Sequence, residues 1–350
     1  MTTTFSSLPI VDVRPLGAPD GASEEELTAL SKRLYDAFAT TGFAYLVNVP
    51  LSYSHATVFN ISREFFTLPE EEKMKLAKRS FRRDHHNTYR GYFPTQSELA
   101  NDNLKEGFEM GPMQPIRTQS TSPSSKFNLT EPNIWPDATI FQKRPQLETL
   151  YTELQALASN LLSLLATSLG KPADYFAPYL EDSLSTLRLL HYPPVVSTAS
   201  GSGSTNSDEV KLSCTPHTDS GILTLLHQDS TGGLEVRNST GEWIAAPYIP
   251  ESLVVNIGDL MAKVSGGRFV ATMHRVRAPA LNASASAIGQ QNGEARAKPL
   301  GRVSVPFFFE PGENCLVKSV DGDEGFVLYG EHVRAKMKTW VEFQDELEDN

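Results

Sequence analysis

Residues 302–309 read Arg-Val-Ser-Val-Pro-Phe-Phe-Phe, a run of strand-forming residues whose side chains alternate between two faces. Arg302, Ser304, Pro306 and Phe308 therefore share one face. An arginine binds a carboxylate through two parallel hydrogen bonds and stays charged when partly buried. This face is suited to hold an organic acid, although an arginine on an edge strand paired with a neighbouring carboxylate is the simpler alternative.

Similar short β-rich runs follow one another through the second half of the chain, separated by Gly, Pro, Asn and Asp. This spacing is typical of an antiparallel sandwich or jelly roll. The runs that we expect to form strands are 186–192, 221–226, 234–236, 242–245, 253–257, 274–277 and 302–309.

The first half of the chain is mostly helical in pattern. Ser23 and Glu26 fit a capping box that opens a helix ending near Gly42, and a short strand follows at 43–47. Leucines at helical spacing predict a long helix from about 141 to 169 that packs one face against a sheet. The polar, low-complexity segments 197–208 and 281–298 are expected to be surface loops.

Metal-binding residue types occur at a suggestive spacing. His217 and Asp219 are two positions apart on an extended segment, so both side chains point to one side. His274 begins another expected strand. Two histidines and one carboxylate on one face leave coordination positions open, as non-haem Fe(II) oxygenases require. Taken alone, however, a His-x-Asp pair is weak evidence.

Together these motifs resemble the isopenicillin N synthase-like branch of the Fe(II)/2-oxoglutarate-dependent dioxygenases. The resemblance covers nearly the whole chain, and the order of the motifs makes it specific. The stretches that carry it are Pro-His-Thr-Asp (216–219), Met-His-Arg-Val (273–276), 302–309, 221–226, 232–236 and 254–261, with 41–45, 65–73, 90–94 and 105–109 in the N-terminal part.

The resemblance implies an α+β fold with a double-stranded β-helix (jelly-roll) core, an N-terminal helical cap and flanking helices. We expect a cap region at 1–125, a long supporting helix segment at 126–185, the jelly-roll core at 186–315 with an insert at 281–299, and a C-terminal segment at 316–350 near the barrel mouth.

The resemblance also implies roles for individual residues. His217, Asp219 and His274 are expected to be the catalytic iron ligands. Arg302, Ser304 and Tyr192 are expected to bind the distal carboxylate of 2-oxoglutarate. Phe308 lies on the Arg302 face and is our candidate for an aromatic substrate contact. Leu190 departs from the pattern, because many plant members carry Asn there.

Composition restricts the partners. The 350 residues carry a formal net charge of −11, which argues against binding to nucleic acid and to anionic membranes. Two cysteines and no apparent targeting or membrane-spanning segment favour a cytoplasmic protein. Its partner is expected to be a small-molecule substrate, and we expect a monomer.

The implied activity is that of an oxygenase that uses Fe(II), 2-oxoglutarate and O₂, with ascorbate as a reductant in vitro. It would hydroxylate, desaturate or cyclise a small organic molecule of secondary metabolism while 2-oxoglutarate becomes succinate and CO₂. Three alternatives stay open: an iron oxidase of the same fold that needs no 2-oxoglutarate, a zinc hydrolase, and a non-catalytic binding protein.

Overall fold

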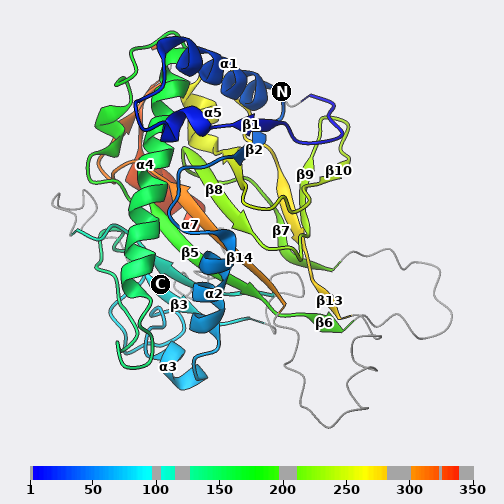
Figure 1. Cartoon of the computed structure of the whole chain (residues 1–350). Coiled ribbons are helices and arrows are strands. Elements are labelled where there is room, and N and C mark those ends of the chain that lie inside the picture. The colour runs from blue at the N-terminus through cyan, green and yellow to red at the C-terminus, as the bar shows by residue number, and fades with distance from the viewer. Residues whose placement is uncertain are drawn as a thin grey trace.

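The strands form two main sheets in the computed structural model of the chain, which describes residues 3–96, 104–114, 127–196, 211–281, 301–322 and 325–338 (Figure 1). The larger sheet contains, in spatial order, β1 (Ile10–Asp12), β2 (Phe43–Val47), β11 (Leu253–Ile257), β8 (Leu223–Gln228), β14 (Arg302–Phe309), β5 (Thr186–Tyr192), β4 (Glu106–Met110) and β3 (Gly91–Phe93). The smaller sheet contains β10 (Trp243–Ala245), β9 (Leu234–Arg237), β12 (His274–Arg277) and β7 (Leu212–His217).

The two sheets share one apolar interior. Phe43, Leu190 and Val254 of the larger sheet belong to the same buried cluster as Val236 and Val276 of the smaller sheet. Facing sheets around a common core are the defining arrangement of a jelly roll. The fold class expected from the sequence, α+β with a jelly-roll core, is confirmed.

Strands from the expected cap extend the larger sheet at both edges. The pair β1 and β2 continues it beyond β11, and the pair β3 and β4 continues it beyond β5. Two short pairs form sheets of their own: β6 (Val195–Val196) with β13 (Ala280–Leu281), and β15 (Leu316–Val317) with β16 (Val327–Leu328). The N-terminal region and the core are therefore one continuous sheet rather than two separately packed layers.

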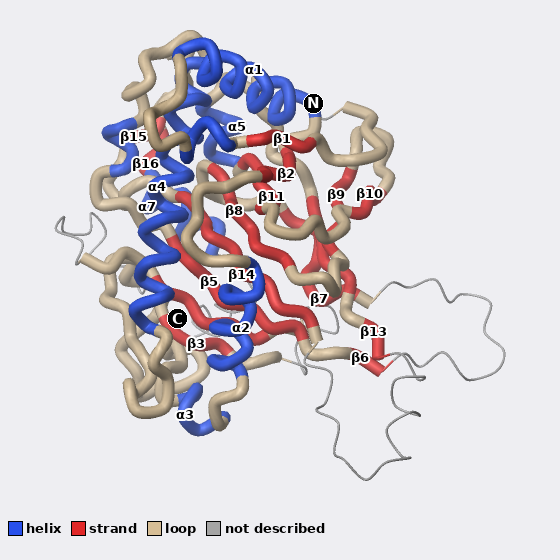
Figure 2. Tube along the Cα trace, in the orientation of Figure 1, coloured by secondary structure: helices blue, strands red, loops and turns tan. Residues whose placement is uncertain are grey.

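Helices cover the outer face of the larger sheet (Figure 2). The long helix is α4 (Arg144–Ser168), close to the predicted span, and the Tyr151 ring lies 5.3 Å from the Phe307 ring of β14. The helix α1 (Glu24–Thr40) packs on α4 and begins with the predicted capping box of Ser23 and Glu26. The remaining helices are α2 (His55–Phe66), α3 (Glu70–Met74), α5 (Asp259–Val264), α7 (Tyr329–Met337) and the short 3₁₀ turns at Arg14–Gly17 and Ala177–Leu180.

Neighbouring residues on β14 therefore face different surroundings. Phe307 belongs to the cluster under α4, whereas the residues alternating with it point into the barrel. The low-complexity segment 197–208 and nearly all of 281–298 lie outside the described residues, as do residues 339–350 of the expected C-terminal segment. Among the described residues, no helix is both long and apolar enough to cross a bilayer.

Candidate active site

The register of the smaller sheet brings the proposed metal ligands together. His217 ends β7 and pairs directly with His274 at the start of β12, so their rings lie 4.2 Å apart between centroids. Asp219 follows two residues later, and its Oδ1 atom lies 3.8 Å from His217 Nε2 and 3.7 Å from His274 Nε2. These three residues form the only group of metal-binding type found in the described parts of the chain.

Hydrogen bonds orient each of these side chains. The Nδ1 atom of His217 lies 2.8 Å from the Thr215 carbonyl oxygen, and that of His274 lies 3.2 Å from the Thr272 carbonyl oxygen. Because a carbonyl only accepts, we assign the proton to Nδ1 in both rings, which leaves both Nε2 lone pairs available to a metal.

The Asp219 carboxylate is held from its other side. Its Oδ2 atom accepts hydrogen bonds from Thr224 Oγ1 at 2.5 Å and from Asn256 Nδ2 at 2.8 Å. Oδ1 is thereby left to face the two imidazoles. Neither Thr224 nor Asn256 was among the site residues expected from the sequence. The available signal was a single polar residue inside an otherwise apolar strand, in 221–226 and again in 253–257.

The three residues of the triad differ in their electrostatic surroundings. Burial raises the pKa of Asp219, but the neighbouring histidines and the two hydrogen bonds outweigh burial, and the net shift is downward. Burial and the nearby His217 lower the pKa of His274 to about 4. At His217 burial acts to lower the pKa, but the neighbouring Cys214 and Asp219 outweigh burial and raise the pKa to about 9, so a metal would have to displace a proton from this ring. The ionised Asp219 and the neutral His274 are already donors that suit Fe(II).

Arg302 lies on the inner face of β14, opposite Tyr192 of β5. Its guanidinium carbon is 4.7 Å from the centre of the Tyr192 ring. The Nη1 atom donates to Ser304 Oγ at 3.1 Å, and Nε donates to the Gly232 carbonyl oxygen at 2.7 Å. The structure thus brings together the three residues that the sequence predicted as an acid-binding group.

The environment of Arg302 fits a bound dicarboxylate. The residue is 1% exposed, and within the described ranges no carboxylate lies at ion-pair distance from it. A buried cation is costly unless an anion compensates it. The distal carboxylate of 2-oxoglutarate would supply that charge.

Phe308 and Leu190 face the same interior. The half-buried Phe308 ring lies 5.1 Å from the Arg188 guanidinium carbon. Leu190 has an apolar setting: it lies opposite Gly107, and a Cβ atom on Gly107 would be 3.0 Å from Leu190 Cδ2 and 2.3 Å from Phe93 Cζ. Leu190 and Phe93 belong to the same buried apolar cluster, so position 190 contributes to apolar packing here.

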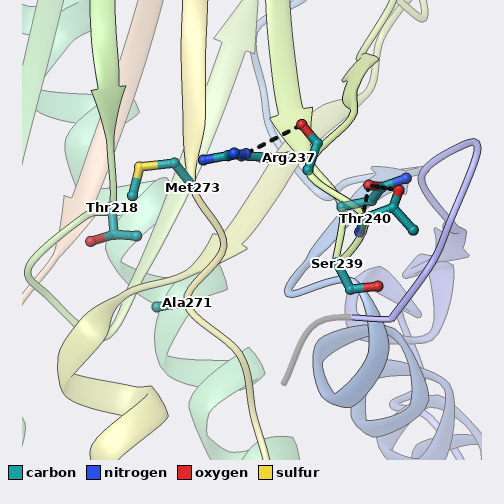
Figure 3. Close-up of a pocket in the computed structure, with 8 residues that line it drawn as sticks. Thr218, Arg237, Ser239, Thr240, Ala271 and Met273 are labelled. Carbon is teal, nitrogen blue, oxygen red and sulfur yellow. Dashed lines mark hydrogen bonds between the residues drawn. The ribbon is translucent and has the colours of Figure 1, made fainter.

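A hollow of about 470 Å³ lies beside the metal triad but contains none of its side chains. Thr218, between the two ligands in sequence, and Met273, just before His274, line this hollow together with Ala271 and residues 237–241. Figure 3 shows Thr218 and Met273 on one side of it and the hydrogen bond from Arg237 to the turn on the other. The hollow is therefore distinct from the coordinating face.

Comparisons with known proteins agree with this geometry. Residues 183–311 match the family model of the 2OG-Fe(II) oxygenase superfamily, and residues 8–138 match the N-terminal model described as non-haem dioxygenase in morphine synthesis. A probable iron/ascorbate oxidoreductase of Dictyostelium discoideum is 31% identical, over 92% of this chain and 86% of that protein. A homoarginine-6-hydroxylase of Arabidopsis thaliana is 30% identical, over 97% and 99% of the two chains.

A solved structure has the same fold throughout. A full-length protein of Neurospora crassa, determined in complex with α-ketoglutarate and 5-formyluracil, superposes with a TM-score of 0.73 at 25% identity, covering 95% of this chain and 96% of that chain. The family models, the full-length relatives and the shared architecture lead to one conclusion: this chain belongs to the Fe(II)- and 2-oxoglutarate-dependent oxygenase family.

Proposed function

We propose that His217, Asp219 and His274 hold the Fe(II) ion and that Arg302, Ser304 and Tyr192 bind 2-oxoglutarate. The family uses Fe(II), 2-oxoglutarate and O₂, and the chain is accordingly an oxidoreductase. The observation that carries the residue assignment is the buried Arg302, which lies on the inner face of the barrel without a carboxylate partner among the described residues.

The chemistry depends on the metal and on what the protein does around it. When bound, Fe(II) couples the oxidation of a small organic substrate by O₂ to the conversion of 2-oxoglutarate to succinate and CO₂. The guanidinium of Arg302 and the hydroxyl of Ser304 orient the distal carboxylate of 2-oxoglutarate. Their burial keeps water from this end of the site. Phe308 would contact the substrate on the same face.

The proposal extends to the organisation of the chain. Residues 186–315 would carry the chemistry, residues 126–185 would support the sheet, and the segments 1–125 and 316–350 would border the substrate. We further propose a monomeric state, and a cytoplasmic location that the absence of a disulfide at Cys214 and Cys315 supports. Sedimentation of the purified protein and imaging of the tagged chain test these two points.

The decisive experiment measures succinate release by the anaerobically reconstituted enzyme after O₂ is admitted, together with anaerobic equilibrium dialysis of labelled 2-oxoglutarate. The substitution Arg302→Gln should weaken 2-oxoglutarate binding roughly 10- to 100-fold, because the charge-assisted pair between Arg302 and the distal carboxylate is lost. The control is Arg144→Gln. Arg144 also pairs with a carboxylate, Glu148, and stacks on an aromatic ring, Trp135, but it lies on α4 at the surface.

The outcomes separate the remaining alternatives. Unchanged 2-oxoglutarate binding in Arg302→Gln would contradict the assignment of Arg302 to the distal carboxylate of 2-oxoglutarate. Substrate oxidation without succinate would favour the oxidase that needs no 2-oxoglutarate. Catalytic turnover with Zn²⁺ as the only metal would favour the zinc hydrolase. Stoichiometric binding of a ligand without turnover would favour a non-catalytic binding protein.

A further inference from the structure

A second arginine lies on the inner face of the barrel. The pairing of β5 with β14 matches Leu190 with Ser304 and Leu187 with Phe307, so Arg188 lies opposite Pro306. By strand alternation Arg188 shares its face with Leu190 and Tyr192. It therefore points into the same interior as Arg302, from a position on β5 four residues before Tyr192.

Aromatic rings surround the guanidinium of Arg188. Its central carbon lies 5.1 Å from the centre of the Phe308 ring and 5.7 Å from that of Phe93. Phe308 in turn lies opposite Thr224, the residue whose hydroxyl holds Asp219. This succession of contacts connects Arg188 with the metal triad along the end of β14 remote from Arg302.

Other charged side chains lie around Arg188. Glu109 forms ion pairs with both Lys78 and Arg188. Two more charged residues interact across this region: Arg90, which is buried, and Glu310, at the end of β14. The single carboxylate of Glu109 is thus shared between two cations.

Only one of the three paired charges can be reached. The side chain of Lys78 is 0% exposed and that of Glu109 is 2% exposed, whereas that of Arg188 is 13% exposed. Burying ions is costly unless other interactions compensate, so a charged group inside a barrel is a weak source of stability. Lys78 and Glu109 instead help to hold a reachable guanidinium in place near the rings of Phe308 and Phe93.

We propose that Arg188 is a specificity-determining residue that binds a carboxylate group of the substrate, whose adjoining apolar part lies against Phe308 and Phe93. The proposal rests on the proposed function and adds the substrate class, a small organic acid with a flat or apolar body. Arg302 is reserved for 2-oxoglutarate, so the two acids bind at opposite ends of the inner face of β14.

Matched acids and amides test the proposal. The enzyme is loaded anaerobically with Fe(II) and saturating 2-oxoglutarate, which keeps the probes from Arg302. Calorimetry then measures the affinity of benzoate, phenylacetate and 3-phenylpropanoate, each against its own carboxamide. At least one acid should bind about tenfold more tightly than its amide, the effect of one charge-assisted hydrogen bond.

Variants test whether the preference for an acid over its amide depends on the side chain of Arg188. Arg188→Gln should abolish the preference for the acid while the amide and 2-oxoglutarate bind as before. Arg188→Lys, which keeps the charge and the pair with Glu109, should retain part of the preference and serves if the Gln variant does not fold. Glu109→Gln removes the competing carboxylate and should tighten acid binding. A merely structural pair would instead weaken all ligands in every variant. Arg144→Gln should change nothing.

The results distinguish this proposal from the function on which it rests. If 2-oxoglutarate binds but every amide binds as well as its acid, or no probe binds at all, the assignment of Arg188 is wrong and the oxygenase function stands. If 2-oxoglutarate does not bind while acids still bind through Arg188, the acid site stands and the proposed cosubstrate site is wrong. Loss of both contradicts both.

Discussion

The two oxygen atoms of the Asp219 carboxylate have different surroundings. Oδ2 accepts hydrogen bonds from Thr224 and Asn256, and Oδ1 faces the two histidines. A carboxylate free to rotate would lose conformational entropy on binding an ion, whereas here its orientation is already fixed. Under the proposed function, Thr224 and Asn256 are therefore positioning residues that orient a metal ligand without touching the metal.

Removing these hydrogen bonds should weaken the metal site without removing a ligand. For Thr224→Val and Asn256→Leu we expect metal affinity to fall roughly 10- to 100-fold, as is typical when a partner that orients a ligand is lost. Anaerobic titration with Fe(II), or with Co(II) as a spectroscopic substitute, measures the change.

The control is Ser31→Ala, which removes a buried hydroxyl that donates to the Leu164 carbonyl oxygen between α1 and α4. An affinity in Thr224→Val and Asn256→Leu equal to that of the control would show that neither hydrogen bond orients Asp219.

At the scale of elements, the absence of a side chain at one position of β4 shapes the barrel interior. Gly107 has no side chain, and the Phe93 ring of β3 occupies that space and reaches Leu190 of β5. A methyl group at position 107 would need to displace this ring.

Gly107→Ala should lower the free energy of unfolding by about 1–3 kcal/mol, the usual cost of overpacking a core. It should also alter substrate affinity, because Phe93 flanks Arg188. Urea denaturation measures the first effect. The matched control is Gly325→Ala, where no atom lies within 4 Å of the added methyl group. Equal stability of the two variants would refute the packing argument.

Some elements could be predicted from the sequence and others could not. The strands β5, β11, β12 and β14 have the predicted ends, because a short run of strand-forming residues between turn residues is local information. The strand β4 was missed, since Glu106 and Glu109 look like surface residues. Their burial depends on partners that are distant in sequence, Lys73 for Glu106 and Arg188 for Glu109. The register that joins such partners is not encoded in either segment alone.

The same difference between local and long-range information decides which residues of the site could be predicted. The proposed metal ligands and the proposed 2-oxoglutarate residues could be predicted because each lies in a short motif whose order is recognisable. Arg188 was not singled out, because its meaning depends on Phe308 and Glu109, and these reach it from two different strands. The sequence of residues 186–192 alone does not show that Arg188 faces inward. Only the register with β14 shows it.

At the scale of the whole molecule, one buried pair makes stability depend on pH. His227 of β8 faces outward beneath α2, and its ring lies 5.2 Å from that of His55. Burial, and then the proximity of His55, lower the pKa of His227 to about 3. The unfolded chain has an ordinary histidine pKa of about 6.5, so below that pH it binds a proton that the folded chain excludes.

Stability should therefore fall on acidification, and His227 should account for about 2 kcal/mol of the loss between about pH 7 and about pH 5. In His227→Phe this part of the loss should disappear. Urea denaturation at both pH values measures it, with the exposed His86→Gln as control. A His227→Phe protein as acid-sensitive as the control would show that another group dominates.

The strand order of the larger sheet has a consequence for folding during synthesis on the ribosome. The strand β14 lies between β8 and β5, yet it is the last of the eight strands to leave the ribosome. Until then the nascent sheet has a gap at its centre, with two unpaired edges that invite pairing with other chains. The proposed metal ligands are all synthesised before β14, whereas Arg302 and Ser304 are synthesised with it. The strand that closes the sheet thus also completes the proposed cosubstrate site, so a prematurely terminated chain would lack both the closed sheet and that site.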